Sequence, residues 1–321
     1  MEITREEIAA AKQRLRSIVR SENRELEIAR IINETFDPEV GVGDIIGKIL
    51  NTTTAAPFEE VNYFLPTNIT KTVLTLSANC NVTHTAVSPT SKQTLTFTDI
   101  CTQDYYICLK DLLNGDHNVL NLYGDEINEE FNRYEIYAML VLMSAAATAQ
   151  SQLFTLDSGV STFTFPKLYE MKKAIRKYGT KFYLITGTNV TEDVDLMDYT
   201  ADKNRETNVN SIITEHIPIE SLDVTVNGSA KDVIGDDEAY LIAVSDVKKQ
   251  RPGWIVRRKF DNAGVVEMPD TVKVSKERLV MRTGNNKSVD TVDKFAKGLA
   301  GYEELGMVIS NPYTVAKFTR E

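Results

Sequence analysis

Side chains that could catalyse a reaction or bind a metal are few in this sequence. Its histidines and cysteines are His84, His117, His216, Cys80, Cys101 and Cys108. They form neither a ligand set with zinc-site spacing nor an even-numbered disulfide framework, and no cysteine has a basic neighbour to activate a thiolate. No G-x-S-x-G elbow is present. The sequence therefore predicts no catalytic residue, no metal site and no cofactor.

Three other segments resemble ligand-binding motifs only in part. Residues 283–288, TGNNKS, end like a phosphate-binding loop but lack two of its glycines, and Gly264 lacks the partner glycines of a dinucleotide fingerprint. Four aspartates lack the Gly and the terminal Glu of a calcium loop: Asp193, Asp195, Asp198 and Asp202. We expect these aspartates to form a solvated face.

One basic cluster stands out around Pro252-Gly253-Trp254. It consists of Lys248, Lys249, Arg251, Arg257, Arg258 and Lys259. It could be a strand flanked by solvated cations, a salt-bridged contact between subunits, or a weak phosphate contact. The chain has a formal net charge of −10 over 321 residues, which argues against a surface built to grip nucleic acid and favours the subunit contact over the phosphate contact.

The strongest element predicted by the sequence is a helix over residues 125–154. Apolar residues recur there at helical spacing, acidic residues crowd its first turns, and no charge follows Glu135 until Asp157. We expect a core helix whose second half is buried on all sides. The apolar part, residues 136–149, is too short for a membrane span, which needs about 20 apolar residues.

The N-terminal region is predicted to begin with a second helix over residues 4–35. Its narrow apolar stripe is Ile8, Leu15, Ile18, Val19, Leu26, Ala29 and Ile32, and arginines alternate with glutamates around it. This composition indicates a solvated or partner-facing helix. Asp37-Pro38 ends it, and the glycine-rich residues 38–60 suggest an extended arm crossing a surface. The N-terminus has no apolar signal core, so we expect a cytoplasmic protein.

Residues 69–101 alternate apolar with Thr, Ser and Asn at the strand period, around a turn at residues 88–91. Between Thr72 and Thr98 the only formal charge is Lys92. Exposed strand edges are normally protected by charge, Pro or bulges. The hairpin could pack within its own domain or lie as a ribbon on a neighbouring subunit.

The rest of the sequence predicts an α/β region followed by a strand near the C-terminus. A helix at residues 167–178, Gly179 and a strand at residues 181–186 make one α/β step into a central sheet. Further strands are expected at residues 212–219, 222–226, 239–244, 253–257 and 302–309, with a polar helix and loop at residues 191–211.

Taken in order, these elements resemble the major capsid proteins of tailed double-stranded DNA phages, the Hong Kong 97-like fold, over residues 40–321. The residues that carry the resemblance are the helix at 125–154, LYEMKKAIRKYGTKFYLITGT (168–188), AYLIAVSD (239–246) and GYEELGMVISNPYTVAKF (301–318). The resemblance implies an α+β fold in four parts: an N-terminal helix and arm (1–60), an E-loop hairpin (61–103), a P domain with the spine helix (104–158 and 255–321) and an A domain (159–254).

What the resemblance implies about function is assembly without catalysis. Such proteins form hexamers and pentamers that tile an icosahedral shell around double-stranded DNA, which they hold by non-specific contact, in a virion assembled in the host cytoplasm. Copies of the chain are the main partners, with portal, scaffold or decoration proteins as further ones, and no membrane is involved. The alternatives are an encapsulin-like protein nanocompartment, which shares the fold, and a soluble α/β enzyme.

Overall fold

A computed structural model describes the chain in segments. The described residues are 43–56, 59–64, 92–102, 118–200, 209–219, 222–245, 251–259, 277–282 and 299–320. The predicted helix at 4–35, most of the predicted hairpin, His84, His117, Cys80, Cys108, Lys248, Lys249, Gly264 and residues 283–288 lie outside them.

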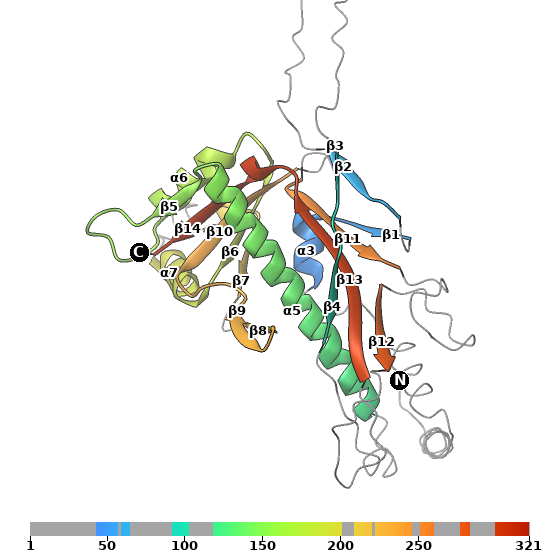
Figure 1. The fold of residues 1–321 in the computed structure, drawn as a ribbon. Helices are drawn as coiled ribbons and strands as arrows, with labels where there is room; N and C mark the ends of the chain where they lie inside the picture. The colour runs from blue at the N-terminus through green and yellow to red at the C-terminus, as the bar shows by residue number, and fades with distance from the viewer. Residues whose placement is uncertain are drawn as a thin grey trace, which may run out of the picture.

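The strands of the described residues form two five-stranded sheets. The first, the central sheet, has helices on both faces (Figure 1). Its strands, in spatial order, are β5 (Leu153–Thr155), β14 (Val315–Thr319), β10 (Glu238–Val244), β6 (Lys181–Thr186) and β7 (Glu215–Pro218). One face packs on α6 (Phe165–Ile175), α7 (Thr188–Thr200) and α8 (Val209–Ile212). Because both faces are covered, β6 and β10 read as continuous apolar runs. The predicted α/β step into a central sheet is confirmed.

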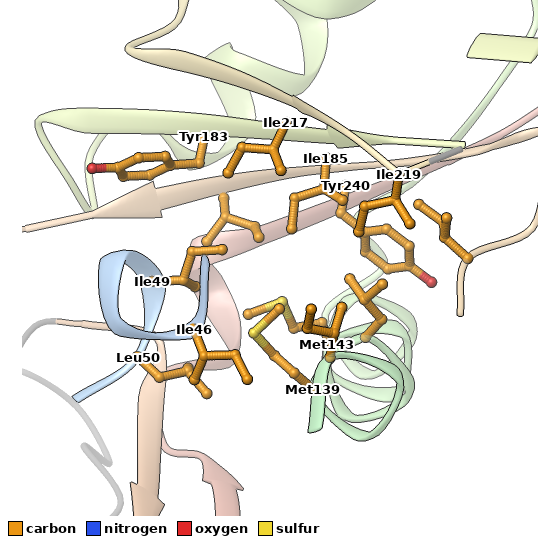
Figure 2. Close-up of a cluster of buried hydrophobic side chains, with 14 of the residues drawn as sticks. Ile46, Ile49, Leu50, Met139, Met143, Tyr183, Ile185, Ile217, Ile219 and Tyr240 are labelled. Atoms are coloured by element: carbon orange, nitrogen blue, oxygen red, sulfur yellow. The ribbon is translucent and has the colours of Figure 1, made fainter. Parts of the chain in front are cut away.

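The opposite face of the central sheet packs on the long helix α5 (Asn118–Ala149) and the short helix α3 (Gly43–Ile49). Figure 2 shows Met139 and Met143 of α5 beside Ile46 and Ile49 of α3, beneath Ile185 of the sheet. The four side chains from the two helices are fully buried. Burying such a side chain contributes roughly 1.5–3 kcal/mol, so this cluster fixes α5 and α3 against the sheet.

The second sheet, the long sheet, is organised around β13 (Leu299–Ile309). Its other strands are β1 (Asn51–Ala55), β11 (Gly253–Arg258), β12 (Arg278–Arg282) and β4 (Thr98–Cys101). β11 and β12 pair with consecutive stretches of β13, while β4 overlaps both stretches. A strand residue has only two neighbours, so β11 and β12 lie end to end on one edge of β13 and β4 lies on the other.

Two small antiparallel pairs complete the described part. β8 (Asp223–Val226) and β9 (Ser229–Asp232) are joined by Asn227-Gly228, both at positive φ (52° and 77°), as a tight hairpin turn requires. β2 (Asn62–Phe64) pairs antiparallel with β3 (Lys92–Thr94), and we call this pair the base of the hairpin. β2 lies before the predicted hairpin at residues 69–101, so the pair does not confirm the bounds of that prediction. A 3-10 turn, Pro312–Thr314, precedes β14.

The predictions for the long helix need two corrections. The helix runs from Asn118 to Ala149 rather than from Asp125 to Phe154, because Ser151 adopts a left-handed φ of 54° and the chain turns into β5. Its second half is not buried on all sides: Ala146 is buried, but Val141, Ala145 and Ala149 are exposed. The helix therefore has one core face and one outer face. None of the described helices is long and apolar enough to span a membrane.

The predicted extended arm at residues 38–60 is also wrong over its described part. Ile46, Ile49 and Leu50 are spaced on one side of α3 and are fully buried, so this segment belongs to the core. β1 follows at once and pairs in parallel with β11, with Asn51 opposite Trp254. The glycines that suggested a loose arm include Gly43 and Gly47, which lie within α3.

The close approach of β13 to α5 at Gly301 gives a direct test. A Cβ at this position would lie 2.5 Å from Ile127 Cγ2 and 2.9 Å from Phe131 Cε2, and both side chains are buried. Gly301→Ala should therefore lower the free energy of unfolding by about 1–3 kcal/mol through overpacking. Gly47→Ala is the control: nothing lies within 4 Å of its Cβ, so this change within α3 should be neutral or stabilising. Urea denaturation compares the two; equal stability would contradict the close approach.

Candidate functional site: a buried charge cluster beneath the long helix

Four charged side chains meet where α5 crosses the long sheet, three of them buried and the fourth, Arg257, mostly buried. Arg278 on β12 stands directly opposite Glu303 on β13, and Arg257 on β11 stands opposite Leu305, two residues further along β13. Since β11 and β12 lie end to end, this two-residue step places both arginines on the same face of the sheet. Glu135 of α5 meets them there. We call Glu135, Arg257, Arg278 and Glu303 the charge cluster.

The ion pairs within the cluster are short and shared. Arg257 donates from Nε and Nη2 to the two carboxylate oxygens of Glu135, at 2.5 and 2.7 Å. Arg278 donates from Nε to Glu303 at 2.9 Å, and its Nη2 lies 3.1 Å from Glu135. Arg257 Nε also lies 3.3 Å from Glu303. The two guanidiniums thus face the two carboxyl groups, and this pairing offsets part of the cost of removing them from water.

Polar groups of α5 complete the surroundings of Arg278. Its Nη1 donates to the Oδ1 atoms of Asn128 and Asn132, at 2.5 and 2.8 Å. Its guanidinium also lies 5.3 Å from the ring centre of Phe131. One side of α5 carries a row of polar residues at helical spacing: Asn128, Asn132 and Glu135. This row contacts the arginines of the long sheet.

Burial and neighbouring charges shift the pKa values of the two glutamates in opposite directions. Burial alone would raise the pKa of Glu135, but the charge of Arg278 and the hydrogen bond and charge of Arg257 outweigh it and lower that pKa from 4.5 to about 2. The pKa of Glu303 is raised well above its usual value by burial and by the nearby Glu135 carboxylate. Glu135 is therefore the firmly ionised member, and Glu303 is the carboxylate closer to protonation.

This arrangement suits a structural junction. Each guanidinium faces a carboxylate, and the cluster joins the strands β11, β12 and β13 to the helix α5. Breaking a buried pair by removing one partner typically costs about 3–5 kcal/mol, because an uncompensated charge is left behind. The cluster thus fixes α5 on the long sheet.

The arginines of the basic cluster predicted from the sequence bind partners within the same chain. Arg251 donates to the carbonyls of Gly47 and Leu50 at the end of α3, Arg257 belongs to the charge cluster, and Arg258 pairs with Glu304 at 2.6 Å. The prediction of solvated cations is therefore wrong for these three arginines. Each of these arginines has a partner within its own chain.

The other described candidates have structural contacts. Thr191 donates its hydroxyl hydrogen to Gly187 O, so Thr186 donates to Thr191 and accepts from His216 Nε2, at 2.7 Å. Asp193 is buried and accepts from Phe163 N at 2.7 Å, so the prediction of a solvated acidic face is wrong for this residue. Cys101 is an exposed free thiol. Among the described residues, no three His, Cys, Asp or Glu side chains are grouped closely enough to hold a metal ion.

The charge cluster was not predicted from the sequence. The available signal was the placement of polar residues on the apolar side of α5, where Asn128, Asn132 and Glu135 alternate with Ile127 and Phe131. That pattern indicates buried polar groups but not their partners. Glu135 and Arg257 are 122 residues apart, and only the fold brings them together.

With this architecture described, comparison with solved structures identifies the class of fold. A structure from Microbacterium phage Oxtober96 matches with a TM-score of 0.55 at 10% identity, over 85% of this chain and 90% of that one. One from Mycobacterium phage Bobi matches with a TM-score of 0.53 at 12% identity, over 86% and 90%. No protein-family model and no curated protein matches the sequence.

A third match is the satellite phage P4 procapsid including size determination protein, at 9% identity and a TM-score of 0.48, over 99% of this chain and 98% of that one. The two matches above 0.5 show that the chain has the α+β, Hong Kong 97-like fold of phage capsid proteins. The resemblance drawn from the sequence is thereby confirmed at the level of the fold.

The opposed pKa shifts in the charge cluster give an acid-stability test. The pKa of Glu135 is lowered to about 2, so its contribution is complete above pH 4.5 and is lost as the pH falls toward 2. Glu135→Gln should destabilise the protein by about 3–5 kcal/mol at pH 7 and should flatten the decline in melting temperature below pH 4.5.

Glu303→Gln is the matched control for this test. The pKa of Glu303 is raised, so its ionisation opposes folding and its contribution is lost as the pH rises. This substitution should destabilise the protein less at pH 7 than Glu135→Gln does. The decline in melting temperature below pH 4.5 should remain. Thermal melts of both variants from pH 3 to pH 7 provide the measurement. Equal losses and equal slopes would contradict the assignment.

Proposed function

We propose that this chain is the shell-forming subunit of a virus-type capsid. Copies assemble into hexamers and pentamers of an icosahedral shell that encloses double-stranded DNA, in a virion built in the host cytoplasm. The observation that carries the proposal is the Hong Kong 97-like fold, which the chain shares with two phage structures over 85–86% of its length. The protein acts through assembly and not through catalysis.

The anchoring of the hairpin supports this proposal. Its base packs on the long sheet: Leu95 is buried with Ala55 and Val256, beside Tyr63. The segment beyond this base, residues 65–91, carries a single formal charge, that of Lys71. A nearly uncharged segment on a fixed base suits a contact with a neighbouring copy, where its apolar and hydroxyl side chains would be covered.

The use of the arginines supports non-specific containment of DNA. The described arginines of β11 are engaged within the chain, and the formal net charge is −10. Strong binding to the phosphate backbone requires several free cations, each releasing counterions. Enclosure by the shell, with weak contacts to the backbone, therefore accounts for retention of DNA better than a high-affinity surface does.

We also propose the division into an N-terminal arm, an E-loop hairpin at residues 61–103, a P domain containing α5, and an A domain at residues 159–254. The pairing of β1 with β11 and the packing of α3 on α5 favour one change. Residues 43–55 fit better with the P domain than with the arm. Portal, scaffold or decoration proteins are further proposed partners.

Light scattering after size-exclusion chromatography tests the proposal on the purified chain. We expect particles of megadalton mass, or capsomers of five or six copies that convert to such particles. Nucleic acid in the particles would support the capsid, whereas a co-purified protein cargo would favour the encapsulin-like nanocompartment. A monomer at every concentration would contradict both.

A hairpin deletion separates assembly from folding. Leu95 and the β2–β3 pair belong to the packed base, so the deletion should remove only residues 70–88, replaced by a short Gly-Ser linker. The variant should remain folded, with a melting temperature near that of the wild type, but should fail to form large particles because weak contacts repeated across copies are lost. Assembly at the wild-type level would contradict the proposed role of the hairpin.

A further inference from the structure

The outer face of α5 carries an apolar strip that the described part of the chain leaves uncovered. Val141, Ala145 and Ala149 follow one another at four-residue spacing; Val141 is 49% exposed, and both alanines are exposed. We call these three residues the outer strip. They lie on the side of α5 opposite the fully buried Met139 and Met143, so they play no part in the core described above.

A groove runs beside the outer strip. It has a volume of about 640 Å³ and lies between α5 and the segment that leads from β9 into β10. Val233 and Ile234 line its far wall, and Ser144 and Thr148 lie on the α5 side. Lys317 at its edge is already paired with Glu238 and bonded to Ser144 Oγ. Small residues along the strip allow another helix to approach closely, at an interaxial distance of about 8–10 Å.

We propose that residues 4–35 of the same chain dock as an amphipathic helix along the outer strip and the adjoining groove. The sequence of this segment provides a narrow apolar stripe from Ile8 to Ile32 among charged residues. An isolated helix of this type gains most of its stability from packing that stripe. The outer strip spans residues 141–149 of α5, about 12 Å at 1.5 Å per residue, so it offers an apolar surface to about two turns of that stripe.

The connection between the two elements favours docking within one chain. Residues 36–42 join the segment to α3, and α3 packs directly against α5. Seven extended residues reach up to about 23 Å, which is enough to pass around a helix of about 10–12 Å diameter. A short tether also gives a high effective concentration, on the order of millimolar, which a separate copy must exceed.

Charge is compatible with this arrangement. The run KQRLRSIVR at residues 12–20 contains four cations and no acidic residue. Asp232 and Glu238 line the groove. Opposite charges at the edge of an apolar contact contribute to its orientation more than to its affinity.

Limited proteolysis of the full-length protein tests the proposal. Trypsin sites lie throughout the segment at Lys12, Arg14, Arg16, Arg20, Arg24 and Arg30. A docked segment should be cut slowly, and Val141→Asp should accelerate cleavage by about five- to tenfold by placing a charge in the strip. Leu196→Asp is the matched control: Leu196 is 58% exposed on α7, outside the strip, and its replacement should leave the cleavage rate unchanged. A wild-type segment cut as fast as in Val141→Asp would overturn the proposal.

Disulfide trapping distinguishes docking within one chain from docking of a second copy. In a background with the three native cysteines replaced by Ser, Val141→Cys is combined in turn with Ile8→Cys, Leu15→Cys, Ile18→Cys and Leu26→Cys, so that the scan covers any register. At least one pair should form an intramolecular disulfide, whereas Val141→Cys with Arg16→Cys, on the polar side, should not. Dimers linked by disulfides, or no linkage in any of the four pairs, would overturn docking within the chain.

Discussion

The charge cluster beneath α5 is the constraint on which the rest of the structure depends. Two arginines and two glutamates are removed from water at one point, and each is tolerable only while the others are in place. Arg257 has a side chain that is 13% exposed, and Glu135 and Glu303 are fully buried. Because the four residues come from one helix and three strands, their pairing fixes the helix position and the register of β11 and β12 against β13 together.

The apolar core then builds outward from that fixed helix. α5 crosses the long sheet near Phe131 and Gly301, and further along it covers the central sheet with Met139 and Met143. The same helix therefore packs on both sheets, as Figure 1 shows. A fold in which one rigid element joins two sheets can present a loop to other copies without losing its own core. This property is what a shell subunit needs.

Much of the fold could be predicted from local sequence. The strand β6 was predicted with the observed bounds, since an apolar run between Gly179 and Gly187 leaves little choice, and β10 was predicted to within one residue. The end of α5 was missed because Ser151 takes a left-handed conformation that its residue type does not signal. The partners of Glu135 were missed because they depend on strand pairing across more than 120 residues. The exposed outer strip was missed because an alanine-rich sequence is compatible with burial or exposure.

The central claim is that the protomer carries surfaces completed only by copies of itself. Negative-stain electron microscopy of the purified full-length protein tests this claim most directly. The account predicts closed, roughly spherical shells of uniform diameter. A field of single compact particles at every protein and salt concentration, with no rings or shells, would contradict it.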